Sequence, residues 1–258
     1  EAVHSAHMFG ESPASPLRDR LRAALHQPAR NAPPAAGASV TERSDLSELG
    51  GHWFETPLGP GYVIESTYEA GHVHGEVALH RALTVDAVRL AGQIRDPRLG
   101  EVDPAAFCYV DTETTGLGGA GTMVFLAGAA RFDGGMLRLR QYLLPGPEFE
   151  GGLLGGLGED LATAGALVSY NGKSFDIPAL EVRYILSRQR PALRALPHLD
   201  LLHPHRRLFR GVVASHRLVE VERSMLGFER EDDCPSAEVP ERYFRFQRSG
   251  DPTHILPV

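Results

Sequence analysis

The order of apolar segments after residue 104 constrains the fold more than any other feature. Three successive segments are predicted strands, and Asp133-Gly134-Gly135 between the last two is a hairpin signal; the segments are 105–111, 122–132 and 136–144. Shorter apolar strands then alternate with helical patterns. The strands are predicted at 166–170 and 196–202, and the helices at 148–164, 178–190, 203–209, 215–226 and 240–248. Antiparallel strands followed by this alternation predict an α/β fold, with a mixed sheet flanked by helices.

The chain divides by composition into three predicted parts. Residues 1–46 form a leader rich in Ala, Pro, Ser and Arg, with an amphipathic helix at 16–27 and a linker at 31–39. Residues 47–103 form a small β-rich extension, in which two strands flank the turn Gly59-Pro60-Gly61. Residues 104–258 form the main domain.

Composition excludes several classes of protein. The chain has 258 residues and a net charge of −7, so it does not coat nucleic acid with its whole surface. It has two cysteines, too few for a disulfide framework, and no apolar run of about 18 residues that could cross a membrane. With no secretory signal at its start, we expect a cytoplasmic protein without a membrane partner.

The first acidic motif is DTETTGL at 111–117. Asp111 and Glu113 are two residues apart at the end of an apolar strand, so both carboxylates leave the same face. Two neighbouring carboxylates raise each other's pKa, and a divalent cation such as Mg²⁺ or Mn²⁺ would remove that repulsion. The alternative is an exposed acidic strand end without a metal.

The second motif is SYNGKSFD at 169–176, where another short strand ends in a polar turn. Ligands of α/β sheets bind beyond the strand ends, so Asp176 is expected to meet Asp111 and Glu113. Three converging carboxylates can hold two cations that act on a phosphodiester. The alternative is that Asp176 serves only as the N-cap of the following helix.

Together these motifs resemble the DEDD 3′–5′ exonucleases of the ribonuclease-H-like superfamily. Within it, HLDLLHPHRRLF at 198–209 and SHRLVEVERSMLGFERED at 215–232 are similar to the YprB-type ribonuclease-H-like domain proteins. The resemblance implies a mixed five-stranded sheet, with the small helix and β-hairpin extension on its N-terminal side. It also implies two divalent metal ions, Mg²⁺ or Mn²⁺, and a single-stranded nucleic acid with a 3′ end as the partner.

The resemblance also assigns roles to individual residues. Three of the four metal-binding carboxylates, which are also the catalytic residues, match Asp111, Glu113 and Asp176. The segment that cradles the terminal nucleotide matches Thr114, Gly116 and Leu117. The segment beside the second aspartate, expected to face the substrate strand, matches Asn171, Lys173 and Phe175.

The fourth carboxylate of this pattern is expected in a later helix, within a His-x₄-Asp or Tyr-x₃-Asp element. No such element follows Gly250 in the sequence, which runs to Val258. Two interpretations stay open: the chain continues beyond Val258 with that helix, or the protein lacks both the acid and the general-base histidine.

Three further features bear on the site. His198 and Asp200 lie on one predicted strand, and Asp200 is either a stand-in metal ligand or, as we favour, a structural residue. Glu222 is expected to pair with an arginine. The segment 203–217 combines four arginines and three histidines, and is either a phosphate-binding surface or a solvated helical face.

The sequence therefore predicts a hydrolase, a metal-dependent 3′–5′ exonuclease that cleaves single-stranded DNA or RNA by a two-metal mechanism. The first alternative is a catalytically impaired module that binds single strands or docks a partner. The second is a ribonuclease-H-like endonuclease. Motifs do not choose between DNA and RNA, because that choice depends on contacts to the 2′ position of the sugar.

Overall fold

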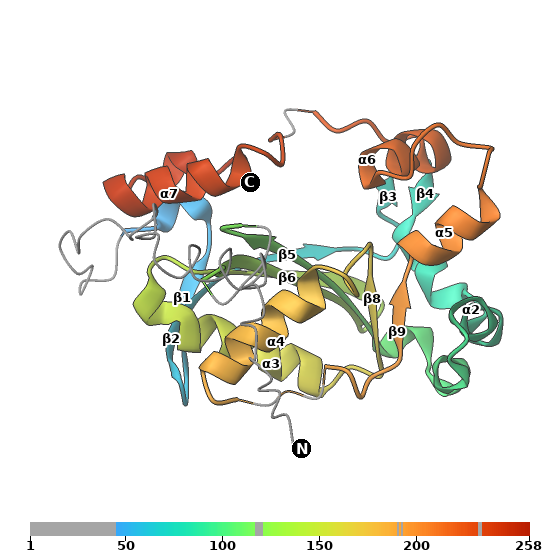
Figure 1. Ribbon diagram of the computed structural model, residues 1–258, viewed down its shortest axis with the longest axis horizontal. Coiled ribbons are helices and arrows are strands. Elements are labelled where there is room, and N and C mark those ends of the chain that lie inside the picture. Colours follow the sequence, from blue (N-terminus) through green and yellow to red (C-terminus); the bar gives the residue numbers. More distant parts are fainter. Residues whose placement is uncertain (1–44, 117–120, 190, 192, 232–233) are drawn as a thin grey trace, which may run out of the picture. The chain divides into compact units, whose positions relative to one another are not determined.

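A seven-stranded mixed sheet forms the centre of the structure (Figure 1). The computed structural model describes residues 45–116, 121–189, 191, 193–231 and 234–258. The order across the sheet is β1-β2-β7-β6-β5-β8-β9. The strand bounds are β1 His52–Thr56, β2 Gly59–Tyr68, β5 Phe107–Thr114, β6 Val124–Asp133, β7 Met136–Leu143, β8 Ala166–Ser169 and β9 His198–Asp200. A separate small hairpin pairs β3 Val73–His74 with β4 Val77–Ala78.

Helices cover this sheet. Their bounds are α2 Ala87–Ile94, α3 Glu150–Ala162, α4 Asp176–Leu186, α5 Leu202–Leu208, α6 Leu218–Val221 and α7 Val239–Ser249. Figure 1 shows α3 and α4 crossing one face of the sheet, where α3 contacts β2 and α4 contacts β5. A π-helical turn at Glu222–Leu226 continues α6.

The core forms two layers because successive residues of β5 point to opposite faces of the sheet. Cys108 and Val110 belong to the larger cluster, with buried leucines of α3 and α4. Phe107 belongs to a smaller cluster on the other face, with Ala91 of α2 and Leu199 of β9. β5 is therefore a central strand: β8 pairs with its first residues, Phe107–Tyr109, and β6 pairs along it from Cys108 to Thr114.

The predicted fold class is confirmed. The predicted five-stranded sheet corresponds to β7-β6-β5-β8-β9, and the predicted turn gives Gly134 and Gly135 positive φ angles of 57° and 84°. The N-terminal hairpin, predicted as part of an extension, continues this sheet, because β2 pairs along β7 from Tyr62↔Leu143 to Tyr68↔Leu137. That pairing covers a strand edge that would otherwise be open.

Other predictions fare differently. The helix at 16–27 and the linker at 31–39 lie outside the described residues, and the division of the chain at residues 46 and 103 stays a prediction. Instead of one regular helix, the segment predicted at 215–226 forms α6 and the π-helical turn. Within the ranges that the structure describes, no helix has the length and apolar character needed to cross a membrane.

Candidate active site

Two carboxylates lie at the carboxyl end of β5. Asp111 pairs with Gly128 of β6, and a bulge falls between Glu113 and Thr114, where the strand leaves its regular register. The alternation of the strand sends Asp111 and Glu113 to one face and Thr112 to the other. The predicted strand ended at Asp111, whereas β5 runs on to Thr114, so both acids are held by strand hydrogen bonding.

A third carboxylate reaches the same end of the sheet from α4. Asp176 is the first residue of that helix, and its side chain is buried. Its Oδ1 accepts a hydrogen bond of 2.6 Å from the Thr112 hydroxyl. Phe175, not Asp176, occupies the N-cap position, so the alternative that Asp176 serves as the N-cap is wrong. The structure thus places Asp176 beside the strand that carries the other two acids.

The three carboxyl groups influence one another electrostatically. Desolvation of its carboxyl group by the surrounding protein and the charge of Asp176 raise the pKa of Asp111 to about 6, although the residue is exposed. Burial, Asp111 and Asp176 raise the pKa of Glu113 to about 7. Burial also raises the pKa of Asp176, and the hydrogen bond from Thr112 opposes that rise. The cluster therefore holds its negative charge at an energetic cost when no cation is bound.

The turn between β8 and α4 has a tightly determined backbone. Asn171 adopts a left-handed φ of 72°, which asparagine tolerates better than most residues. A Cβ on Gly172 would lie 2.4 Å from the Ser169 hydroxyl and 3.1 Å from a carboxylate oxygen of Asp176. Only glycine fits there, so the turn brings its backbone directly against Asp176.

Buried Asp200 fixes this turn. Its carboxylate accepts hydrogen bonds from the backbone N–H groups of Asn171 at 2.7 Å, Lys173 at 3.0 Å and Leu202 at 3.1 Å. Its side chain is fully buried. These bonds agree with a structural role for Asp200: it orients the polar turn and the start of α5 together.

His198 supports the same turn from β9. Its Nε2 lies 2.8 Å from the Ser169 hydroxyl, which in turn accepts a hydrogen bond from the N–H of Gly172. Burial and the charge of Lys173 lower the pKa of His198 to about 4, so its ring is neutral at pH 7. A neutral, buried ring bonded to a serine serves to position the turn.

The residues expected to contact nucleic acid lie within a few positions of the acids in the chain. The Thr114 hydroxyl donates to the carbonyl of Gly116 at 2.7 Å, which shapes the chain immediately after β5. Lys173 and Phe175 are exposed, and 55% of the surface of Phe175 is open to solvent. Asn171 is partly buried in the turn. Leu117 lies outside the described residues.

Sequence reasoning missed two partners of the acids. One is Thr112, whose position between two acids gave no sign of its bond to Asp176. The other is Arg230, whose charge lowers the pKa of Asp111 and which Glu222 holds through a 2.6 Å ion pair. The expectation that Glu222 pairs with an arginine is confirmed. No local pattern signals Arg230, because it comes from a loop distant in the chain.

By the chemistry of their donors, the three acids fit a hard divalent cation such as Mg²⁺ or Mn²⁺. Asp176 raises the pKa of Asp111, and both aspartates raise the pKa of Glu113, so the three acids lie within electrostatic range. In the described part of the chain, however, no three His, Cys, Asp or Glu side chains are already arranged to hold a metal ion. The three acids are therefore near one another, but their side chains are not already arranged to coordinate a metal ion together.

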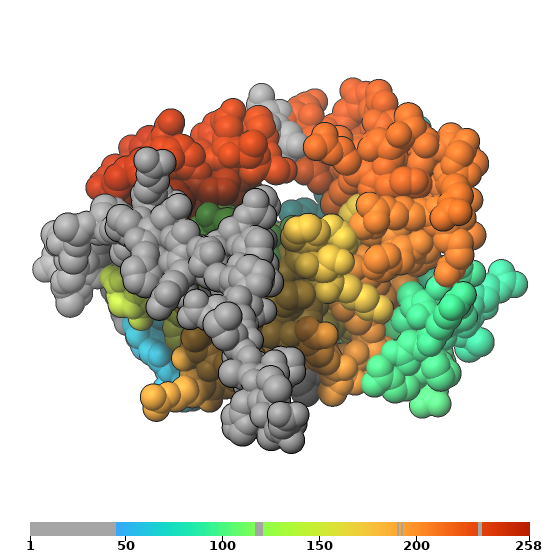
Figure 2. Space-filling view, in the orientation of Figure 1, coloured from blue at the N-terminus to red at the C-terminus, as the bar shows by residue number. Residues whose placement is uncertain are grey.

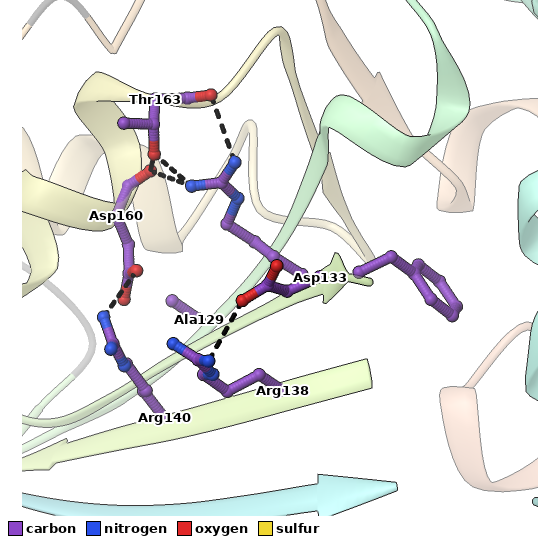
Figure 3. Close-up of a pocket in the computed structure, with 8 residues that line it drawn as sticks. Ala129, Asp133, Arg138, Arg140, Asp160 and Thr163 are labelled. Atoms are coloured by element: carbon purple, nitrogen blue, oxygen red, sulfur yellow. Dashed lines mark hydrogen bonds and ion pairs between the residues drawn. The ribbon is translucent and has the colours of Figure 1, made fainter. Parts of the chain in front are cut away.

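A pocket of about 280 Å³ lies toward the start of β5, away from the acids (Figure 3). Arg131 donates to the carbonyls of Asp160 and Thr163 at the end of α3. Arg140 bridges Asp160 at 3.0 Å and Glu65 at 2.7 Å. These bonds tie α3 to the sheet, so the pocket is lined by groups that already have structural partners.

The sheet order, the helices and the acidic strand end define a ribonuclease-H-like domain. A match to the RNase_H superfamily covers residues 108–258, more than half of the chain, and the chain belongs to that superfamily. Its members are usually hydrolytic nucleases. Over 152 residues the chain is 40% identical to the uncharacterized protein YprB of Bacillus subtilis (strain 168). The matched stretch is 58% of this chain and 37% of YprB, so the chain spans well under half of that relative.

Proposed function

We propose that the protein is a metal-dependent 3′–5′ exonuclease of the DEDD type that hydrolyses phosphodiester bonds of single-stranded DNA or RNA. The observation that supports the proposal is that Asp111, Glu113 and Asp176 lie near the same end of the sheet, where the charge of Asp176 raises the pKa of Asp111 and both aspartates raise the pKa of Glu113. Folding alone does not favour such a group, whereas a cation-binding site requires one.

In this proposal the three acids hold Mg²⁺ or Mn²⁺. Two bound ions would activate a water molecule and stabilise the leaving 3′ oxygen. The chain's own residues position the acids and the substrate. Thr112 fixes one oxygen of Asp176, and Asp200 fixes the turn that precedes it. Both therefore act as positioning residues.

The substrate strand is proposed to lie over the exposed side of the polar turn. The open ring of Phe175 is available for stacking on a base, and the Lys173 ammonium for a phosphate. Asn171 supports the backbone of the turn. The segment with Thr114, Gly116 and Leu117 would receive the terminal nucleotide, as the family resemblance implies.

The test uses the full-length protein with single-stranded DNA and RNA labelled at the 5′ end, in the presence of Mn²⁺. The expected result is a ladder of products shortened from the 3′ end. Asp111→Asn is expected to lower the rate at least about 100-fold, because it removes a ligand of the ions that activate the water. The matched control is Asp133→Asn, an exposed acid at the far end of β6.

Two outcomes would contradict the proposal. One is full-length protein that leaves every single-stranded end intact, and the other is an Asp111→Asn variant that cleaves as fast as the parent. Cleavage of a circular single strand, which has no end, would instead assign an endonuclease.

A second candidate function is binding of single strands without hydrolysis. The observation that favours it is that the described residues form no finished metal site, with Asp176 hydrogen-bonded to Thr112. Tight, salt-dependent binding of a single strand by a protein that never cleaves it would select this function.

A further inference from the structure

The segment 201–217, which we term the basic lobe, contains α5 and the loop after it. No Asp or Glu occurs between Asp200 and Glu220, although the chain as a whole has a net charge of −7. Four exposed arginines lie in the lobe: Arg206, Arg207, Arg210 and Arg217. The lobe is therefore a positive region on a negative protein.

The arginines of the basic lobe differ from most others in the structure. On α7, Arg242 forms an ion pair with the N-cap residue Glu238, and Arg245 and Arg248 each pair with Glu241. Among the residues that the structure describes, none of the four lobe arginines forms an ion pair with a carboxylate, and Arg207 bonds only to the neutral Gln93. Their charges are thus available to an external anion.

The basic lobe is fastened to the candidate active site at both of its ends. At its start, Asp200 accepts from the N–H of Leu202 and from the turn at Asn171. At its end, the carbonyl of His216 accepts a 2.6 Å hydrogen bond from the Tyr170 hydroxyl. Figure 2 shows the orange surface of the lobe directly beside the yellow surface that precedes α4.

Inside the lobe, histidine and aromatic side chains pack against one another, while the arginines are exposed. His205 is buried, its Nδ1 lies 3.0 Å from Nδ1 of His216, and its ring stacks on Phe209. Leu208 and Val212 are exposed between the arginines, at 59% and 74%. A surface that mixes fixed cations with apolar side chains suits a single strand, which offers both phosphates and bases.

We propose that the basic lobe binds the sugar-phosphate backbone of the substrate strand, beyond the linkage that is cleaved. This proposal rests on the proposed function and deepens it, because it makes a long single strand, rather than a dinucleotide, the preferred substrate. Each arginine that contacts a phosphate releases a counterion, so binding weakens as salt rises.

The binding test needs no catalysis. It measures fluorescence anisotropy of a labelled single strand of about 20 nucleotides in EDTA, at salt from about 50 to about 200 mM. The variant Arg206→Gln/Arg210→Gln/Arg217→Gln is expected to bind at least about 10-fold more weakly than the parent. The slope of log K against log salt is expected to become less steep by about 2. Each lost phosphate contact on a single strand accounts for about 0.7 of that change.

Two matched variants serve as controls for this binding test. The α7 variant Arg242→Gln/Arg245→Gln/Arg248→Gln removes the same number of charges from paired arginines, and we expect it to bind the strand as the parent does. The variant Arg206→Lys/Arg210→Lys/Arg217→Lys keeps the charge, and should keep most of the affinity and the salt slope. Thermal melts show that each variant is folded.

The proposal is overturned if the glutamine lobe variant, folded, binds as tightly as the parent, or if the α7 variant loses as much affinity. A second readout applies if the protein hydrolyses nucleic acid: the ratio of kcat/KM for the long strand to that for a trinucleotide is expected to fall in the glutamine lobe variant. If strand binding depends on the lobe while no form of the protein hydrolyses any strand, the lobe proposal stands and the exonuclease proposal falls.

Discussion

At the scale of single residues, the acid cluster makes folding sensitive to pH. The folded pKa values of Asp111 and Glu113 lie above those of the unfolded chain, at about 6 and about 7. The folded protein therefore binds protons more tightly than the unfolded protein between about pH 4 and pH 7. Without metal, the contribution of these groups to stability is greatest below their unfolded pKa values and is lost as pH rises through the folded ones.

Removing one charge should stabilise the metal-free protein. At pH 8 in EDTA, Glu113→Gln is expected to raise Tm by about 2–4 °C, equivalent to about 1 kcal/mol after solvent screening is allowed for. At pH 4.5 the gain should shrink, because Glu113 is then largely protonated in the folded protein. Differential scanning fluorimetry measures both values, with the exposed Glu159→Gln as control. A Glu113→Gln variant that melts below the parent at pH 8 would contradict the electrostatic argument.

Divalent cations should reverse this penalty. We expect Mn²⁺ or Mg²⁺ at about 100 times its Kd to stabilise the parent protein by about 2.7 kcal/mol at pH 8, and Asp111→Asn to lose most of that gain. The measurement is Tm against metal concentration, with Ca²⁺ as a further cation. Equal shifts in the parent and in Asp111→Asn would mean that the ions bind elsewhere.

The hydroxyl of Thr112 should matter through Asp176. Thr112→Val removes the donor of the 2.6 Å hydrogen bond to Asp176, so we expect a loss of about 1–2 kcal/mol of stability at pH 8. Thr112→Ser keeps the hydroxyl and should restore both stability and the metal-induced Tm shift. Chemical denaturation at pH 8 measures the stability of the two variants, and metal titration measures their metal-induced Tm shifts. If valine and serine behave alike, the hydrogen bond does not position Asp176.

Much of this site could be predicted from residue patterns. Strand alternation predicts Asp111 and Glu113 on one face of the sheet, and the polar turn after β8 predicts Asp176 near them. The bond from Thr112 and the charge of Arg230 could not be predicted, because each depends on how distant segments pack. Sequence spacing predicts which residues share a face of one helix or strand. It does not predict which residues of different helices, strands or loops come into contact.

At the scale of secondary structure, helix α3 illustrates both the success and the limit of sequence patterns. Its glycines weakened the helical signal, yet they are what allows it to pack. A Cβ on Gly152 would lie 1.9 Å from the carbonyl oxygen of Pro60, in the turn region of the N-terminal hairpin. The local sequence showed the glycines, and only the packed structure shows their reason.

Two glycines of α3 should respond in opposite ways to alanine. Gly152→Ala is expected to destabilise the protein by about 1–3 kcal/mol, because the new methyl group meets backbone that cannot yield freely. Gly158→Ala meets nothing closer than the Tyr184 hydroxyl at 3.6 Å, and should stabilise the helix by about 0.5–1 kcal/mol. Urea denaturation measures both changes. Equal effects of the two variants would show that the hairpin does not lie against α3.

At the scale of the whole molecule, the fold class followed from the order of strands and helices, whereas the width of the sheet did not. Hairpin signals locate two paired strands but do not say where the pair docks. The seven paired positions that join β2 to β7 depend on long-range contact. This is why the N-terminal hairpin was expected as part of a separate extension and is found in the main sheet.

Hydrogen exchange should show whether the sheet unfolds as one unit. We expect the β2 amides bonded to β7 and the amides of β6 to exchange at similar, slow rates, because the β2–β7 ladder makes both strands part of one hydrogen-bonded sheet. Mass spectrometry of peptides covering Gly59–Tyr68 and Val124–Asp133 provides the comparison. Much faster exchange in β2 would support an independent extension at 47–103.

The double attachment of the basic lobe has a consequence for how this protein can diversify. Asp200 and Tyr170 hold the two ends of the basic lobe, residues 201–217. The surface between these two attachments can therefore change while the acid cluster stays the same. If the lobe binds the substrate strand as proposed, changes to this intervening surface would alter the length or type of strand that is bound. Substrate preference and cleavage chemistry would then evolve on separate stretches of the same chain.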